Sequence, residues 1–320
     1  MTSREIRIGT RGSALALFQA NWVKDRLLEH HPGLKVSVVK IKTTGDKILD
    51  TPLAKIGGKG LFVKEIEEAL IRKEIDLAVH SIKDVPTELP KGLHLSAITK
   101  REDPRDAFIS KEGTRLRDLP KGAKIGTSSL RRQAQLLHFR DDFQMIPLRG
   151  NLDTRIRKLK TENLDGIVVA LAGLKRLGLE MNVTEILPPE ISLPAIGQGA
   201  LGIESRIGDM EIEEKIRFLN DPDSSIAITA ERSFLKRLGG GCQVPIAAFG
   251  RIENSVLKLD GMVGSLEGRR LVRDQVEGPA DQGESIGTGL AEILLKNGAE
   301  EILREVYQKS NSQWTPGNEQ

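Results

Sequence analysis

The sequence predicts a two-lobed α/β protein followed by a small α+β domain. Over the first two thirds of the chain, short apolar segments alternate with helical patterns, as in sheets built from parallel strands. The apolar pattern breaks into charges and a proline near residues 99–105, which we interpret as a hinge into a second lobe. After about residue 220 three closely spaced strand patterns with short turns appear instead, which predicts antiparallel pairing.

The composition is that of a soluble globular protein, and 320 residues are too many for one ordinary core. Lys and Arg (48) nearly balance Asp and Glu (45), and aromatic residues make up 3%, so a general nucleic-acid binder is disfavoured. The single cysteine excludes an internal disulfide and fits a reducing compartment. Residues 1–7 lack the apolar run of a secretion signal, and the apolar stretch 166–174 is far too short to span a membrane. We therefore expect a cytoplasmic protein without a membrane or nucleic-acid partner.

The first lobe begins with a strand over Ile6–Gly9 and a helix over Ala14–Glu29. Ser13 is a natural N-cap for this helix. Arg11 lies beside the helix start, where a cation is unfavourable unless an anion joins it. The segment is either a plain capped helix or an anion site.

A second strand is predicted over Val36–Ile41 and a second helix over about Val63–Lys73. The loop before this helix carries Lys55, Lys59 and Phe62 together with several glycines. It is either a solvated surface loop or a lid that closes over an acidic, partly apolar ligand.

A buried strand of the parallel-sheet type is predicted over Asp76–Ser81, and Lys83 and Asp84 follow it. In open α/β sheets the ligand lies beyond the carboxyl ends of the strands. This position makes Asp84 the candidate for a catalytic acid or base. His80 lies within the strand, and we interpret it as a core histidine with a satisfied side chain.

In the second lobe a strand over Ala123–Gly126 precedes Thr127 and Ser129, which are placed to cap a helix that opens with Arg131 and Arg132. Two arginines in a first helical turn contradict the dipole rule, which favours acidic residues there. Local rules tend to fail at functional sites, so we interpret this helix start as an anion-binding site.

The same pattern occurs twice more in this lobe. A strand near 145–148 is followed by Arg149, Gly150 and a helix that carries Arg155, and a strand over 166–170 leads to Arg176. Any one of these arginines alone would be a surface charge. Together with Arg11 and the lysines of the first lobe, they predict a cleft for a ligand with many carboxylates or phosphates.

The stretch 193–204 is predicted to be a second crossing strand with glycines for close packing. Two crossings between α/β lobes are typical of type-2 periplasmic binding proteins, which is an analogy at the level of the fold. The expected domains are 1–99 with 200–219, then 100–199, then 220–308. A polar tail over 309–320 is expected to be disordered.

The third domain is predicted to contain a helix over 224–238, strands over 246–252, 255–263 and 269–276, and two closing helices at 285–296 and 300–307. Three glycines precede Cys242 and Pro245 follows it, so the thiol stands in a tight loop. Cys242 is either an attachment point or a small buried hydrophobe.

From about Ile6 to Tyr307 these residues closely resemble the porphobilinogen deaminase family, also called hydroxymethylbilane synthases. The resemblance rests on several specific segments in the right order. They are Gly58–Phe62, His80–Pro86, Gly126–Arg132, Arg149–Asn151 and Gly240–Pro245.

The resemblance implies a three-domain transferase of tetrapyrrole biosynthesis, with a cleft between its first two domains and a dipyrromethane cofactor bound to Cys242 through a thioether. Four porphobilinogen molecules are joined head to tail onto this cofactor with loss of ammonia, and hydrolysis frees linear hydroxymethylbilane. The family implies a monomer whose product passes to uroporphyrinogen-III synthase. No metal site is expected.

Specific roles follow from the resemblance residue by residue. Asp84 matches the catalytic acid, which hydrogen-bonds pyrrole nitrogens, assists loss of the amine and stabilises the cationic azafulvenium species. The implied cofactor contacts, besides Cys242, are Ser81, Lys83, Thr127, Ser129, Arg131, Arg132, Gly150 and Arg155. The implied contacts to substrate or the growing chain are Arg11, Ser13, Gln19, Lys55, Lys59, Phe62, Arg149, Arg155 and Arg176.

Two readings from other classes remain open. A two-lobed binding module for a polyanionic metabolite would use the same arginines but leave Cys242 a free thiol. An RNA-binding protein fits less well, because the net charge is only +3 and aromatic residues are scarce. The combination of the glycine–cysteine loop with Asp84 favours the enzyme, because a pure binder needs neither.

Overall fold

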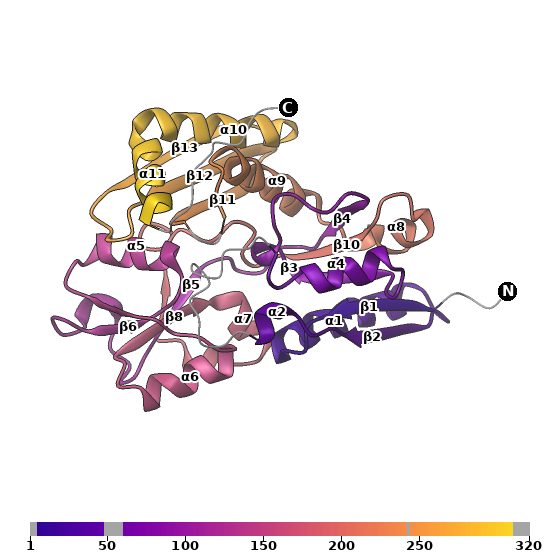
Figure 1. Cartoon of the computed structure of the whole chain (residues 1–320), viewed down its shortest axis with the longest axis horizontal. Helices are drawn as coiled ribbons and strands as arrows, with labels where there is room; N and C mark the ends of the chain where they lie inside the picture. The colour runs from indigo at the N-terminus through magenta and orange to yellow at the C-terminus, as the bar shows by residue number, and fades with distance from the viewer. Residues whose placement is uncertain (1–4, 48–59, 242–243, 310–320) are drawn as a thin grey trace. The chain divides into compact units, whose positions relative to one another are not determined.

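The computed structural model describes residues 5–47, 60–241 and 244–309, and these fall into two compact units (Figure 1). Unit 1 contains the described residues up to 102 together with 199–225. Unit 2 contains 103–198 and the described residues from 226 onward. The chain therefore passes between the units at 102–103, at 198–199 and at 225–226.

Unit 1 is built on a five-stranded sheet in the order β2-β1-β3-β10-β4. Strand β1 runs parallel to β2 and β3, whereas β10 runs antiparallel to β3 and β4. The strands are β1 (Ile6–Thr10), β2 (Val36–Lys40), β3 (Leu77–Ser81), β4 (Leu93–Ile98) and β10 (Leu201–Arg206). The helices are α1 (Ala14–His30), α2 (Thr44–Lys47), α4 (Lys64–Ile71) and α8 (Met210–Ile216).

Helix α1 begins where the sequence predicts, because the Ser13 hydroxyl accepts a hydrogen bond from the Ala16 amide at 3.3 Å. Its buried face, with Val23 and Leu27, packs on the apolar residues of β1. The Thr10 hydroxyl donates a hydrogen bond to the Ala16 carbonyl oxygen at 3.1 Å, which ties the carboxyl end of β1 to the start of α1.

The first part of unit 2 repeats this arrangement with the sheet order β7-β6-β8-β5-β9. Strand β6 runs parallel to β7 and β8, and β5 runs antiparallel to β8 and β9. The strands are β5 (Asp106–Ser110), β6 (Lys124–Gly126), β7 (Gln144–Ile146), β8 (Gly166–Ala170) and β9 (Glu185–Leu187). The helices are α5 (Leu130–Phe139), α6 (Leu152–Thr161) and α7 (Leu171–Arg176).

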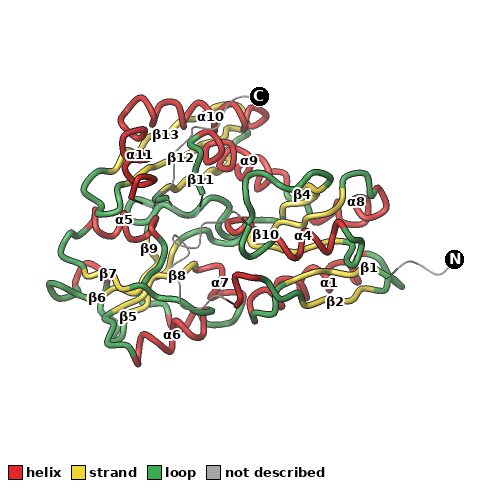
Figure 2. The backbone as a smooth tube through the Cα atoms, in the orientation of Figure 1, coloured by secondary structure: helices red, strands yellow, loops and turns green. Residues whose placement is uncertain are grey.

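The rest of unit 2 is a three-stranded antiparallel sheet that shares a core with three helices (Figure 2). The strands are β11 (Ile246–Glu253), β12 (Val256–Gly264) and β13 (Leu271–Pro279), and the helices are α9 (Pro222–Arg237), α10 (Gly283–Leu294) and α11 (Glu300–Lys309). Phe234 of α9 is fully buried in this core. Gly287 allows the close approach of α10 to α9, because a Cβ at this position would lie 2.1 Å from the Ala230 carbonyl oxygen.

Short single turns connect these elements. They are η1 (Ile82–Asp84), η2 (Leu116–Asp118), η3 (Glu180–Asn182), η4 (Arg217–Leu219), η5 (Ala280–Gln282) and the π-helical turn η6 (Leu295–Ala299). None of the helices within the described ranges is long and apolar enough to cross a bilayer.

The α/β class, the two lobes and the C-terminal three-stranded antiparallel sheet are confirmed. The crossing strand predicted over 193–204 is wrong in its first part, because only β10 from Leu201 is a strand. Gly197 and Gly199 adopt positive φ angles of +68° and +97°, which a strand does not allow. The prediction of close packing holds at Gly199, where a Cβ would lie 2.3 Å from the Glu102 carbonyl oxygen. Strands β4, β5 and β9 were not predicted.

Candidate functional site

One pocket of about 60 Å³ in unit 1 collects residues from four segments. They come from the loop after β1, the start of α1, the residues just before α4, and the end of β3 with η1. Because β1 and β3 are parallel neighbours, their carboxyl ends meet at the same edge of the sheet. The described residues that line the pocket include six of the predicted site residues: Arg11, Ser13, Gln19, Phe62, Ser81 and Asp84.

Two contacts order the polar side of this pocket. The buried Gln19 amide donates a hydrogen bond to the Ser81 hydroxyl at 2.9 Å and so ties α1 to the end of β3. The Arg11 guanidinium carbon lies 4.2 Å from the centroid of the Phe62 ring, a cation–π contact. Arg11 is therefore held over an aromatic face.

Asp84 occupies the end of η1, directly after β3. The turn is anchored by the buried Ile82 side chain, and the Val85 amide closes it on the Ile82 carbonyl oxygen at 3.0 Å. The Asp84 side chain is exposed, and Asp84 is the only carboxylate among the described residues that line the pocket. An exposed carboxylate beside an arginine and two hydrogen-bonding side chains can attract a cation or accept and return a proton.

Unit 2 gathers a second group of predicted residues at the carboxyl ends of its parallel strands β6 and β7. Ser129 caps α5, and its hydroxyl accepts a hydrogen bond from the Arg132 amide at 3.4 Å. The Thr127 hydroxyl in turn accepts one from the Ser129 amide at 3.2 Å. After β7, the Arg155 Nε donates to the Gly150 carbonyl oxygen at 2.9 Å, and Gly150 has a φ of +114°. The backbone at Gly150 therefore needs glycine.

Arg131 and Arg132 are buried, and both bind the same internal acid. One Arg131 nitrogen donates to Asp106 at 2.8 Å and one Arg132 nitrogen donates to it at 2.7 Å. Burial opposes ionisation of Asp106, but the two guanidinium groups outweigh it and hold the pKa of this carboxyl well below its usual range. Asp106 of the chain itself therefore supplies part of the negative charge that Arg131 and Arg132 are predicted to bind.

One hydrogen-bond donor of Arg132 is not used by the described part of the chain. Its Nε is buried and has no hydrogen-bond partner among the residues that the structure describes. An unsatisfied buried N–H of a cation is costly unless an acceptor completes it. The Arg132 environment therefore fits an anionic group such as a pyrrole carboxylate.

The remaining predicted residues have different outcomes. Cys242, Lys55 and Lys59 lie outside the described residues. Arg149 and Arg176 are half-buried; Arg149 lies beyond β7, and Arg176 ends α7 in the lobe that contains Thr127 and Gly150. Lys83 is half-buried next to Asp84.

Four buried polar or charged residues were not predicted to be functional: Asp106, Glu67, Glu204 and His80. His80 was interpreted as a core residue, but it also lines the pocket. His80 does have a partner, as predicted for a core histidine, since its Nε2 lies 2.9 Å from Glu204. The available signal was an acidic residue inside or at the head of an apolar run, as at Glu204 in 201–206 and Asp106 in 106–110.

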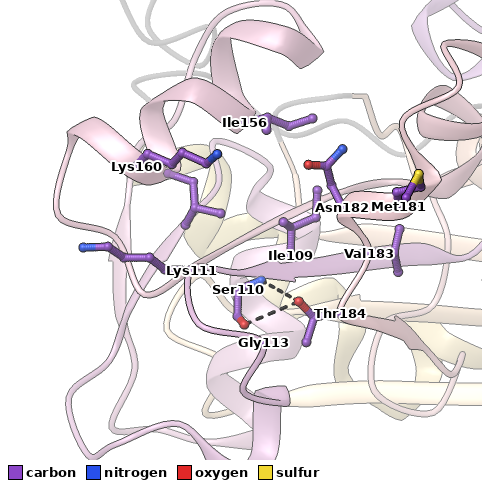
Figure 3. Close-up of a pocket in the computed structure, with 11 residues that line it drawn as sticks. Ile109, Ser110, Lys111, Gly113, Ile156, Lys160, Met181, Asn182, Val183 and Thr184 are labelled. Carbon is purple, nitrogen blue, oxygen red and sulfur yellow. Dashed lines mark hydrogen bonds between the residues drawn. The ribbon is translucent and has the colours of Figure 1, made fainter.

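A larger pocket of about 420 Å³ lies elsewhere in unit 2 and contains none of the predicted site residues (Figure 3). Ile109 and Ile156 form part of its apolar wall, and Lys111 and Lys160 line it as well. The Ser110 amide and hydroxyl are both bonded to the Thr184 hydroxyl, at 3.0 and 3.4 Å. Ser110 and Thr184 are therefore already paired with each other.

Solved structures to which this chain shows some similarity include the probable amino-acid ABC transporter extracellular-binding protein ytmK from Bacillus subtilis. It is 9% identical, has a TM-score of 0.41, and the match covers 68% of this chain and 90% of that one. The L-cystine solute receptor of Neisseria gonorrhoeae is 16% identical with a TM-score of 0.39, and the match covers 67% and 85%.

Other proteins are far more similar to this chain in amino-acid sequence. The porphobilinogen deaminase of Geotalea uraniireducens is 60% identical over 98% of both chains, and that of Geobacter metallireducens is 60% identical over 97% of both. Residues 6–214 match the family described as porphobilinogen deaminase, dipyromethane cofactor binding domain. Residues 225–296 match the porphobilinogen deaminase C-terminal domain. The chain therefore belongs to the porphobilinogen deaminase family.

Proposed function

We propose that this chain joins porphobilinogen units at the pocket of unit 1, with Asp84 as the catalytic acid. Family membership makes the chain a transferase of porphyrin biosynthesis. One observation carries the assignment of the site: six side chains that the sequence singles out at separate positions converge on one pocket. Asp84 is the one carboxylate among the described lining residues, so it is the group suited to a developing positive charge.

The cofactor of the family is a dipyrromethane, and we propose Cys242 as its attachment point because it is the only cysteine in the chain. When bound, this group supplies the pyrrole carbon onto which porphobilinogen units are added with release of ammonia. The residues proposed to hold it are Ser81, Lys83, Thr127, Ser129, Arg131, Arg132, Gly150 and Arg155. The unsatisfied Nε of Arg132 supports this part of the proposal, since a carboxylate of the cofactor would complete it.

The chain's own groups divide the work around Asp84. Arg11, Ser13 and Gln19 bind the acetate and propionate of the incoming porphobilinogen and orient its aminomethyl group toward Asp84. The carboxylate of Asp84 hydrogen-bonds the pyrrole nitrogen and stabilises the positive charge that develops as ammonia leaves. The Phe62 ring keeps Arg11 extended toward the pocket through their cation–π contact.

Arg149, Arg155 and Arg176 are proposed to bind the carboxylates of the elongating chain, together with Lys55 and Lys59. Each added pyrrole brings two more carboxylates, so a set of fixed cations is needed along its path. We further propose three domains with the boundaries predicted above, a cytoplasmic monomer, and delivery of the product to uroporphyrinogen-III synthase.

The attachment of the cofactor is tested by the intact mass of the denatured protein beside Cys242→Ser. We expect the parent to carry an excess mass of two linked pyrroles and the variant to carry none. The parent should also gain further pyrrole units after porphobilinogen is added. If the parent's mass stays that of the bare chain before and after porphobilinogen, the binding module with a free Cys242 becomes the better reading.

The role of Asp84 is tested by Asp84→Asn in protein whose mass shows a loaded cofactor. The substitution keeps the shape and removes the charge, so we expect kcat to fall at least about 100-fold. The Tm should stay within about a degree, because the side chain is exposed. Glu88→Gln, at an exposed acid in the same loop, is the matched control and should keep parental kcat. Parental kcat in Asp84→Asn would remove Asp84 from the mechanism.

A further inference from the structure

Behind the pocket of unit 1 lie three buried titratable side chains that the reaction described above does not use. They come from three elements: Glu67 from α4, His80 from β3 and Glu204 from β10. Glu67 is 7% exposed, His80 5% and Glu204 0%. We call these three residues the acid–histidine cluster.

Two residues of the cluster form a hydrogen-bonded pair, whereas two of its carboxylate oxygens lack a hydrogen-bond partner among the described residues. His80 Nε2 lies 2.9 Å from Glu204 Oε2, which makes a buried hydrogen-bonded pair. Glu204 Oε1 and Glu67 Oε1 are also buried, and neither has a hydrogen-bond partner among the described residues. Two carboxylates thus share the neighbourhood of a single imidazole.

Elementary electrostatics limits the charges that such a cluster can hold. Burying one ion pair is tolerable, but a second carboxylate without its own cation is strongly disfavoured. Accordingly, burial and the neighbouring Glu204 raise the pKa of Glu67 to about 7, although His80 acts in the opposite direction. Ionisation of Glu67 therefore adds one negative charge behind the pocket near neutrality.

Most other titratable groups around α4 are engaged elsewhere. Helix α4 packs against β1, β3, β4 and β10. Lys64 on α4, and Lys83 and Asp84 directly after β3, are further charged groups on or beside these elements. Arg7 and Arg206 bind Asp76, His94 pairs with Glu213, Glu65 accepts from the Thr44 amide, and Glu68 pairs with Arg72.

The cluster also reaches the substrate site directly. His80 lines the same pocket as Arg11, Ser81 and Asp84, whereas the other four histidines of the chain are absent from its described lining. A charge on the cluster therefore acts on whatever occupies that pocket, through a poorly screened protein interior. Porphobilinogen carries two carboxylates, so a negative cluster opposes its binding.

We propose that Glu67, buried behind the pocket with the His80–Glu204 pair, is a positioning residue whose ionisation sets the charge there, so that porphobilinogen binding weakens as the pH rises through neutrality. This inference rests on the proposed function of the pocket. It assigns to α4 a part in substrate binding that does not require Glu67 to touch the substrate.

The test is the pH dependence of KM and kcat for porphobilinogen between pH 6 and 8.5, using holoenzyme of verified mass. The carboxylates of the substrate titrate near pH 4 and its primary amine near pH 10, so neither changes in this range. For the parent we expect KM to rise roughly three- to tenfold, as one added charge at this range implies. In Glu67→Gln, which keeps the shape and cannot ionise, KM should change less than twofold.

Two further variants keep the test decisive. Glu68→Gln, at the adjacent and half-exposed acid of the same helix, should retain the parental rise in KM. Glu204→Gln removes a neighbouring charge that raises the pKa of Glu67, so the rise in KM should move to lower pH, which provides a second route if Glu67→Gln folds poorly. A parental rise that persists in Glu67→Gln, or a profile that is unchanged in Glu204→Gln, overturns the proposal.

The pH dependence of KM in the parent protein also tests the proposal, without any variant. A flat KM in an active parent overturns the cluster proposal and leaves the proposed function standing. A parent with loaded cofactor that does not consume porphobilinogen overturns both.

Discussion

Each α/β sheet of the molecule holds a fully buried acid on its fourth strand, Glu204 on β10 in unit 1 and Asp106 on β5 in unit 2. Both strands run antiparallel to the strand before them in the sheet order, β3 and β8. Both are also the first strands that the chain enters after crossing from the other unit. The two acids are therefore topological equivalents.

Their surroundings differ in kind. Asp106 receives hydrogen bonds from two arginines and also from the Ser192 hydroxyl and the Gln198 amide, each at 2.8 Å. Glu204 has one histidine partner and a second acid, Glu67, nearby. The two arginines lower the pKa of Asp106 and keep it ionised, whereas burial beside Glu204 raises the pKa of Glu67 to about 7. The same fold thus supports a permanent and a titratable buried charge.

The largest effect on stability is expected from Asp106→Asn, which removes the permanent buried negative charge. This leaves Arg131 and Arg132 buried without their anion, which should cost about 3–5 kcal/mol of stability. Thermal unfolding should show a Tm lower by several degrees, together with a lower yield of cofactor-loaded protein by mass. Glu253→Gln, at an exposed pair with Lys258, is the control and should leave Tm unchanged. A parental Tm in Asp106→Asn would mean that the two arginines do not need this acid.

A smaller effect, with a distinctive pH dependence, is expected from Glu67→Gln. In the unfolded chain Glu67 ionises near 4.5, and in the folded protein near 7, so the folded state binds more protons between these values. Stability due to this group is therefore present below pH 4.5 and lost as the pH rises to about 7. The difference corresponds to roughly 3 kcal/mol.

Because Glu67→Gln cannot ionise at this position, its Tm relative to that of the parent should be higher at pH 8 than at pH 5. For Glu68→Gln, the difference in Tm from the parent should be the same at both pH values. A Tm difference between Glu67→Gln and the parent that stays constant with pH would contradict the raised pKa of Glu67.

The smallest effect concerns the way each unit holds its site arginines. Arg11 rests on the Phe62 ring, whereas the arginines of α5 are held by a carboxylate. A cation–π contact at such a site contributes about 0.5–1 kcal/mol. Phe62→Leu should therefore raise the KM for porphobilinogen about two- to fivefold with little change in kcat. Phe18→Leu changes an exposed aromatic of α1 outside the pocket and should leave KM unchanged. An unaltered KM in Phe62→Leu would show that Arg11 is oriented by other contacts.

The sequence by itself determined the elements whose signals are local. The strand at 166–170 and the starts of α1, α5 and α6 lie where the apolar runs, the caps and the turns place them. It also placed Arg11 and Asp84 at one edge of the sheet in unit 1, because both follow parallel strands whose carboxyl ends must meet there. Both conclusions need only the neighbouring residues and the geometry of a parallel sheet.

Tertiary structure alone decided which buried charges meet. Asp106 lies 25 positions from Arg131, and Glu204 lies 124 positions from His80, so no periodicity connects them. Likewise, Gly197 and Gly199 have positive φ angles, and residues 196–199 form a turn where a strand was predicted. A buried charge is tolerated only beside the partner that neutralises it, and the fold, through the order of its strands, supplies that partner.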